Sequence, residues 1–180
     1  MAHRFKVAQG GPCPHFITNT IVEWLPVFTS EPYVKIIFDS LEHLRRHRGL
    51  AVHAYVIMPT HMHAILTAGN DDLSGVMRDF KKFTSRAIYE QADKEGNQLL
   101  TRMFREAAKR NPRSRFKVWQ DGFHPEAICS RRFFLQKLDY LHANPIRRGL
   151  VNDAGEWYYS SFITYETGQE GPLEIDRLEW

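Results

Sequence analysis

The chain contains little cysteine, no long apolar run and no strong excess of charge of either sign. Its 180 residues include two cysteines, Cys13 and Cys129, which excludes a disulfide framework and a cysteine-rich zinc site. No apolar stretch approaches the roughly 20 residues that a membrane-spanning helix needs. The opening residues, Met1 to Lys6, lack the apolar core of a signal peptide, so we expect a cytoplasmic protein.

The composition that remains is that of an ordinary globular domain, with 43% apolar and 25% charged residues. A chain of this length forms one core with appendages. We therefore predict a single domain over residues 1–180. Its expected parts are a core at about 15–162, a basic insert at about 92–117 and a C-terminal tail at 163–180.

Hydrophobic periodicity predicts four strands and three helices. The strands are expected at residues 15–22, 50–58, 61–67 and 126–129, and the helices at 32–48, 73–91 and 131–143. The predicted apolar stripe of the second helix consists of Leu73, Val76, Phe80, Phe83 and Ala87. The order of these elements predicts an α+β fold, with a ferredoxin-like βαββαβ core and one additional C-terminal helix.

The third predicted strand begins with His61, Met62 and His63. Residues two apart on a strand point to the same face, so the two imidazoles project together and Met62 projects into the opposite layer. Two imidazoles on one rigid face can hold a divalent metal, and imidazole ligands alone suggest zinc, manganese or another transition metal. The alternative is a chance pair, because the chain has nine histidines.

The third predicted helix carries a second group of candidate residues. Phe134, Leu138 and Leu141 recur at helical spacing and are expected to face the core. Tyr140 and Asn144 lie one turn apart on a side outside that stripe. A phenol and an amide there can reach a metal or a phosphate, although a packed interface tyrosine is the more common explanation of such spacing.

Basic residues are concentrated in one region of a chain whose net charge is only +3. Seven cations lie between Arg102 and Lys117, against the single acid Glu106. Arg78, Lys82 and Arg86 form a further basic ridge on the second helix. A basic block of this kind suggests a polyanionic partner, and the alternative is a solvated surface loop.

Five ordered blocks of the sequence resemble those of a known family. Met58 to Leu66 resembles the His-hydrophobic-His signature of the HUH single-tyrosine transposases, and Leu138 to Val151 resembles the signature of their catalytic helix. Further blocks match in the same order at Phe80–Thr84, Trp119–Phe123 and Trp157–Ser161. The resemblance covers about His15 to Phe162 and is closest to the REP-associated tyrosine transposases.

The resemblance implies a metal-dependent enzyme that cleaves single-stranded DNA at or near hairpins through a 5′-phosphotyrosine intermediate. It implies that Tyr140 is the nucleophile, that His61 and His63 bind Mg²⁺ or Mn²⁺, and that Asn144 completes the metal site. It also implies a monomer with the tyrosine helix docked in cis, with a dimer as the alternative. The residues that we expect to bind DNA are Arg78, Lys82, Arg86, Arg102, Arg105, Lys109, Arg110, Arg113, Arg115, Lys117 and Trp119.

The chain departs from the family pattern at Thr60, which stands where Asn or Glu is more usual, and in the length of its basic insert. Two functions from other classes remain open at the level of the sequence. A non-catalytic module can bind single-stranded nucleic acid through aromatic rings and basic residues. A zinc hydrolase needs a third strong ligand, for which His53, His124 and His142 are candidates.

Overall fold

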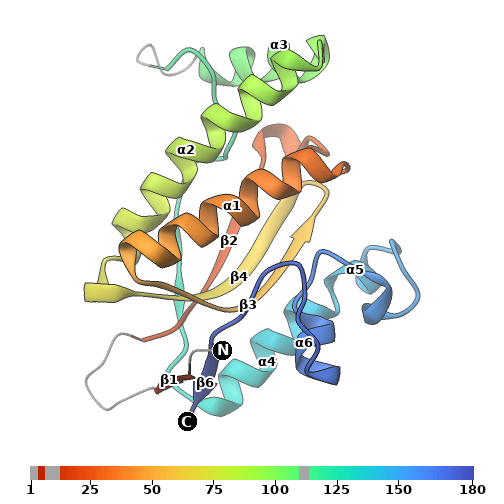
Figure 1. Cartoon of the computed structure of the whole chain (residues 1–180). Coiled ribbons are helices and arrows are strands. Elements are labelled where there is room, and N and C mark those ends of the chain that lie inside the picture. Colours follow the sequence, from red (N-terminus) through yellow and green to blue (C-terminus); the bar gives the residue numbers. More distant parts are fainter. Residues whose placement is uncertain (1–3, 7–12, 110–113) are drawn as a thin grey trace.

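The computed structural model describes residues 4–6, 13–109 and 114–180. A four-stranded antiparallel sheet with the order β3-β4-β2-β5 forms its centre (Figure 1). The strands are β2 (His15–Thr20), β3 (Leu50–Met58), β4 (His61–Ala68) and β5 (Glu126–Ala127). A separate parallel pair joins the two ends of the chain through β1 (Arg4–Lys6) and β6 (Arg177–Glu179).

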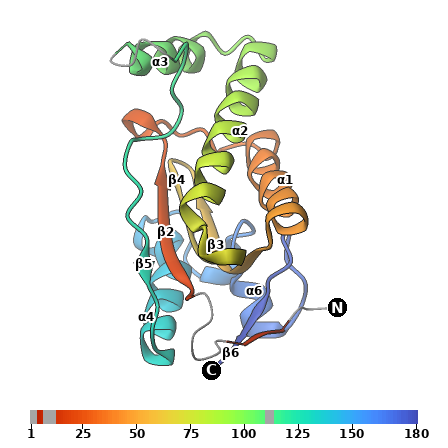
Figure 2. The ribbon, with the colours of Figure 1, turned by 90° about the vertical axis from the view of Figure 1, so that its left-hand side faces the viewer.

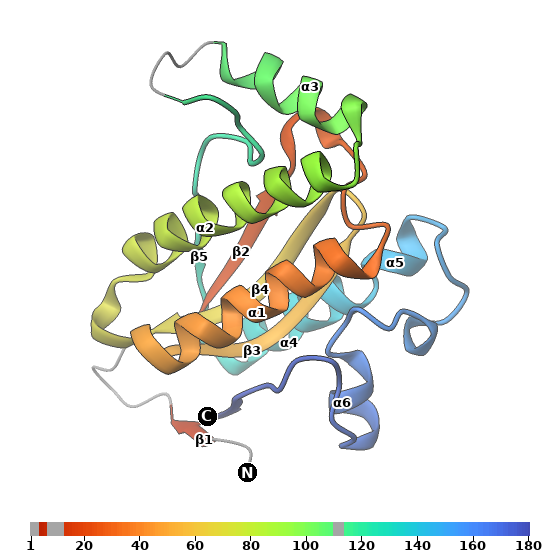
Figure 3. The same cartoon turned by 45° about the horizontal axis from the view of Figure 1, so that its top comes forward.

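Helices cover both faces of the sheet. Helices α1 (Glu31–Arg48) and α2 (Leu73–Lys94) lie on one face, and α4 (Arg131–His142) lies on the other (Figures 2 and 3). The remaining helical segments are α3 (Gln98–Ala108), α5 (Asn144–Arg147), α6 (Phe162–Thr167) and the 3₁₀ turns η1 (Val22–Trp24), η2 (Gly69–Asp71) and η3 (Ala154–Glu156). The predicted α+β class is confirmed, and the description of the core as ferredoxin-like remains our interpretation of the strand order.

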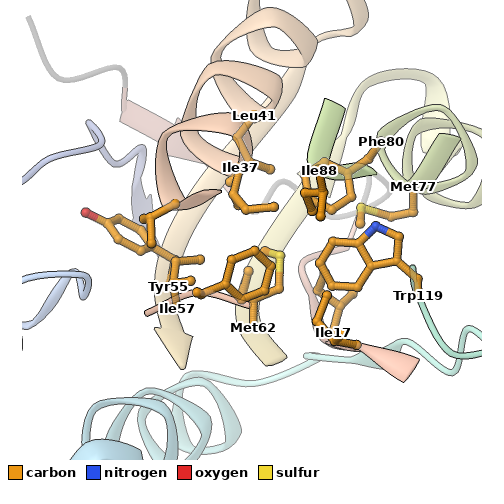
Figure 4. Packing of buried hydrophobic residues seen from close by; sticks show 14 of the residues in the cluster. Ile17, Ile37, Leu41, Tyr55, Ile57, Met62, Met77, Phe80, Ile88 and Trp119 are labelled. Carbon is orange, nitrogen blue, oxygen red and sulfur yellow. The ribbon is translucent and has the colours of Figure 1, made fainter. Parts of the chain in front are cut away.

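The two-residue period of the strands divides the buried residues into two cores. Ile17, Ile57 and Met62 face α1 and α2 in the larger core (Figure 4). Val56 and Ile65 face α4 in a smaller core. Because alternate residues of β4 point to opposite faces, this division fixes the α4 face as the one toward which His61 and His63 project.

The buried face of α2 differs from the predicted stripe. Phe83 was expected in the core but is 59% exposed, whereas Thr84 and Ile88 are fully buried. Thr84 tolerates burial because its hydroxyl donates to the Phe80 carbonyl and accepts a hydrogen bond from the Trp119 indole. Because the stripe was predicted from hydrophobicity alone, it placed Phe83 in the core instead of the adjacent Thr84.

Part of the basic insert is helical. Helix α3 occupies 98–108, begins at Asn97, whose side chain accepts from the Leu100 N–H, and buries Phe104. The predicted Arg110 and Arg113 lie outside the described residues.

The core also extends beyond its predicted limit at residue 162, because Leu173 and Ile175 pack in the larger core. Among the described residues, no helix combines the length and apolar character that crossing a membrane requires.

Candidate active site

His61 and His63 lie side by side on the α4 face of the sheet. Their ring centres are 4.8 Å apart, and the residues are 9% and 5% exposed. Met62 between them is buried in the opposite core. The common orientation expected from strand geometry is therefore present, and the rigid sheet holds both rings in place.

Threonine hydroxyls fix the orientation of both histidine rings. Nδ1 of His61 is hydrogen-bonded to Thr60 Oγ1 at 2.9 Å, and Nδ1 of His63 to Thr18 Oγ1 at 2.8 Å. Thr18 is the cross-strand partner of His63 in the pairing of β2 with β4. When Nδ1 carries the proton and donates it to the hydroxyl, Nε2 presents its lone pair to a metal.

The surroundings keep both imidazoles neutral. Burial lowers the pKa of His61, and the positive charge of Arg148 lowers it further. Burial, followed by the neighbouring His61, lowers the pKa of His63 to about 3. Metal binding requires the deprotonated ring, so these two side chains are in the form that a cation needs at neutral pH.

Tyr140 lies over this pair. Its ring centre is 5.5 Å from that of His63 and 5.9 Å from that of Phe16. Phe134 and Leu141 anchor α4 in the smaller core, while Tyr140 stays 39% exposed at the edge of that contact. The phenol is therefore partly accessible to a ligand from solvent and close to the histidine pair in the same chain.

Asn144 supplies a third polar group. It is 5% exposed, its side chain is hydrogen-bonded to the His61 ring, and its Nδ2 donates weakly to the Tyr140 carbonyl at 3.4 Å. His142, one of the candidate third ligands of a zinc hydrolase, places Nε2 2.9 Å from the Ser161 hydroxyl.

Two neutral imidazoles and an amide form a donor set that fits a divalent cation of the transition series, such as Mn²⁺. Among residues 4–6, 13–109 and 114–180, no cluster of three or more histidine, cysteine, aspartate or glutamate residues is present. Two of the three histidines considered as the third ligand of a zinc hydrolase are hydrogen-bonded to other residues. His53 is hydrogen-bonded to the Asp176 carbonyl and to Thr67, and His142 to Ser161.

A groove of about 1320 Å³ lies between α2, α3, η1 and residues 114–123, on the opposite face of the sheet from α4. It is lined by several of the predicted DNA-binding residues and by one cation that was not predicted. The cations among these residues are Arg78, Lys81, Lys82, Arg86 and Lys117, and the predicted Trp119 also borders the groove. At one end of the sheet the segment that leads into the groove lies beside the start of the histidine strand, because the Ile21 N–H before η1 donates to the carbonyl of Thr60.

The other predicted DNA-binding residues differ in their surroundings. Arg105 donates to the Tyr89 hydroxyl at 2.7 Å, and Lys109 pairs with Glu106 at 2.6 Å. Arg102 and Arg115 are exposed and do not line the groove.

Trp119 borders the groove but is only 4% exposed, packs against Phe28 and Phe80, and donates to Thr84. It is therefore a core residue as well, and its role in DNA binding stays a prediction.

Two residues that sequence reasoning missed belong to these sites. Thr18 contacts His63, and only the register of β2 against β4 reveals that contact. Trp24 lines the groove, is 64% exposed, and has a positive φ of 50° that is uncommon for a non-glycine residue. In the sequence, Trp24 is an aromatic residue that comes shortly after an apolar strand. That pattern is typical of an ordinary core residue, so it did not indicate an exposed ring.

Comparison with known proteins supports the resemblance found in the sequence motifs. No protein-family model matches the chain. A REP-associated tyrosine transposase of Escherichia coli (strain K12) is 27% identical over 121 residues, which cover 66% of this chain and 58% of that protein. The predicted resemblance to REP-associated tyrosine transposases is thereby confirmed.

A solved structure of the REP-associated tyrosine transposase bound to a REP hairpin matches with a TM-score of 0.64 at 21% identity. The match covers 97% of this chain and 89% of that chain, and it shows that the two share a fold. This chain spans 58% of the length of the Escherichia coli relative, so the activity of the whole relative extends to it only as a proposal.

Proposed function

We propose that this protein cleaves single-stranded DNA at or near a hairpin, with Tyr140 as the nucleophile. The observation that carries the proposal is the position of the Tyr140 ring, 5.5 Å from the ring of His63, on a helix that leaves it partly exposed. A partly exposed phenol above two neutral imidazoles suits attack on a phosphate better than it suits a structural contact. A non-catalytic binding module would need neither this arrangement nor the buried amide of Asn144.

The proposed chemical step exchanges one phosphoester bond for another. Tyr140 Oη forms a bond to the scissile phosphorus while the bond from phosphorus to the 3′-oxygen breaks. The phenol proton passes to solvent, and the departing 3′-oxygen takes up a proton. The products are a 5′-phosphotyrosine link and a free 3′-hydroxyl, so the energy of the phosphoester is conserved for later strand transfer.

Nε2 of His61, Nε2 of His63 and the side-chain oxygen of Asn144 are the atoms that we propose to hold a divalent cation, Mg²⁺ or Mn²⁺. Such a cation, when bound, polarises the scissile phosphate and offsets the negative charge of the transition state. The chain itself orients these ligands through Thr18 and Thr60 and aligns Tyr140 through the packing of α4.

We further propose that DNA reaches this site from the groove beside α2. Arg78 and Lys82 line the groove and form no ion pair with any described residue, so their charges are available to phosphates. Trp24, unlike the buried Trp119, offers an exposed ring for stacking on an unpaired base. The matching solved structure is of a protein bound to a REP hairpin, which supports a hairpin as the ligand.

Replacement of Tyr140 tests the proposal directly. In Tyr140→Phe, cleavage of single-stranded hairpin oligonucleotides and formation of the covalent protein–DNA adduct are expected to disappear, because the attacking oxygen is gone. DNA affinity and the melting temperature should change little. Adduct formation is measured on denaturing gels with end-labelled DNA in the presence of Mn²⁺.

Tyr158→Phe is the matched control, since Tyr158 is 69% exposed and was not assigned to the site. This control should cleave at the parent rate. An adduct that persists in Tyr140→Phe would show that another residue is the nucleophile.

A further inference from the structure

Two arginines lie at the end of α5, the short helix that comes after the one carrying Tyr140. The guanidinium carbon of Arg147 lies 5.2 Å from the centre of the Tyr140 ring. Arg148 is the next residue, and its N–H donates to the carbonyl of Asn144, the buried amide residue of the site. Its charge also contributes to lowering the pKa of His61 and His63. The sequence motifs contain both arginines without indicating what either does.

Hydrogen bonds of the short helix α5 fix the backbone of both arginines. The Arg147 N–H donates to the Ala143 carbonyl at 2.9 Å, and the Arg148 N–H donates to the Asn144 carbonyl at 3.1 Å. Gly149, with φ of 66°, ends this turn and fixes the backbone that presents both side chains.

The two guanidinium groups are exposed and have no acidic partner. Neither forms an ion pair or a side-chain hydrogen bond with any described residue. Lys137 contrasts with them: it also lies near His63, but its charge is paired with Glu126 at 2.8 Å. The edge of the site therefore carries two unpaired positive charges beside the proposed nucleophile, which is the electrostatic environment that an anion requires.

We propose that Arg147 and Arg148 bind the nonbridging oxygens of the phosphate that Tyr140 attacks, an inference that rests on the proposed cleavage function. A guanidinium offers a planar pair of donors that matches two phosphate oxygens, and the contact of Arg147 with the Tyr140 ring keeps that fork beside the phenol. The charge of the phosphate grows as the new bond forms, so donors already in place stabilise the transition state more than the ground state.

Single-turnover cleavage of a hairpin oligonucleotide tests the assignment. Arg147→Gln and Arg148→Gln are each expected to slow cleavage by about 100-fold, as for the loss of one donor to a developing oxyanion. Lysine at either position should restore part of the rate, because it restores the positive charge but not the planar pair of guanidinium donors. Mn²⁺ affinity and the binding of uncleaved DNA in a Tyr140→Phe background should stay within about threefold of the parent.

Arg46→Gln is the control for net charge, since Arg46 is exposed on α1, away from the α4 face. It should cleave at the parent rate. Rates within threefold of the parent in both Arg147→Gln and Arg148→Gln would overturn the inference while leaving Tyr140 as nucleophile intact. A parallel loss of Mn²⁺ affinity would also overturn it, because the arginines would then act by supporting the metal ligands.

A second measurement does not depend on cleavage. Titration of the full chain with inorganic phosphate, followed through the arginine Nε–H signals in NMR spectra, should shift the signals of Arg147 and Arg148 saturably and leave that of Arg46 in place. Spectra of Arg147→Lys and Arg148→Lys assign the signals. If the chain binds phosphate at these arginines but cleaves no DNA, the inferred anion site stands and the proposed cleavage function is refuted. If the signals of Arg147 and Arg148 do not shift, the anion site itself is refuted.

Discussion

At the scale of single residues, the orientation of the two histidines depends on two threonines. Thr18 and Thr60 each place a hydroxyl 2.8–2.9 Å from the Nδ1 atom of one ring. Partners of this kind select the tautomer and the direction of the metal-binding nitrogen. Thr60, which departs from the usual residue of the family pattern, therefore has a defined contact with His61 here.

We predict that Thr18→Val and Thr60→Val each lower Mn²⁺ affinity by about 10- to 100-fold. The substitution keeps the shape of the side chain but removes the hydroxyl that orients the ring. Isothermal titration calorimetry measures the effect, and Thr167→Val on α6 is the control. Unchanged affinity in Thr18→Val would mean that packing against Phe16 and the hydrogen bond with the Ile17 backbone suffice to orient His63.

At the scale of secondary-structure elements, the proposed DNA surface divides into two parts. Helix α2 contributes Arg78, Lys82 and Arg86 along the groove, of which Arg86 pairs with Glu90 at 2.7 Å. The basic insert contributes α3 and the segment after it, where Arg105 is held by Tyr89. The strength of each contribution is measurable through salt dependence, because every phosphate contact releases bound counterions.

Replacing Arg78, Lys82 and Arg86 by Gln is predicted to reduce the slope of log affinity against log salt by roughly 2 for single strands. Replacing the insert cations by Gln is predicted to reduce it by roughly 3, if each contacts one phosphate. That second variant changes Arg105, Arg110, Arg113 and Arg115. Fluorescence anisotropy at several salt concentrations measures both slopes.

The control for these variants replaces Lys35 and Arg46 on α1, which face away from the groove. An unchanged slope in the insert variant, together with a reduced slope in the α2 variant, would restrict the DNA surface to the groove. It would also identify the insert as a solvated segment.

At the scale of the whole molecule, buried histidines connect stability to pH. Burial lowers the pKa of His53 and of His142 to about 4. The unfolded chain binds protons at these sites below about pH 6.5, whereas the folded chain does not until about pH 4. Folding stability is therefore lost as the pH falls through this range, by up to about 1.4 kcal/mol per pH unit for each buried ring.

We predict a steep fall in the free energy of unfolding between about pH 6.5 and pH 4, measured by urea denaturation. His53→Gln should be less stable at pH 7, because it disturbs the hydrogen bonds to Asp176 and Thr67, but its stability should depend less on pH. His43→Gln, on the exposed side of α1, should keep the parent slope. An equal slope in His53→Gln would show that this ring titrates normally in the folded protein.

The oligomeric state is predicted to be monomeric. Tyr140 lies over the histidine pair of its own chain, so the site is complete within one copy. Light scattering in solution should therefore give a mass near 21.1 kDa. A mass of about twice that value, with activity restored by mixing Tyr140→Phe and His63→Ala chains, would instead indicate that the tyrosine helix is exchanged between subunits.

The sequence by itself determined those features that depend on local geometry. The strand period places His61 and His63 on one face, and the helical turn places Tyr140 near Asn144, because the backbone fixes both spacings. The same reasoning located the main strands and α4 to within a few residues, and the ordered motifs indicated the family resemblance that the comparison confirmed.

Only the tertiary structure decided which residues surround those side chains. Thr18 contacts His63 although 45 positions separate them in the sequence. The buried Trp119 donates a hydrogen bond to Thr84, which is 35 positions away. The position of Arg147 over Tyr140 likewise depends on how α5 is placed after α4 ends at His142. Periodicity describes the direction in which a side chain leaves its own element, whereas register and helix docking arise from many long-range contacts that no single local pattern encodes.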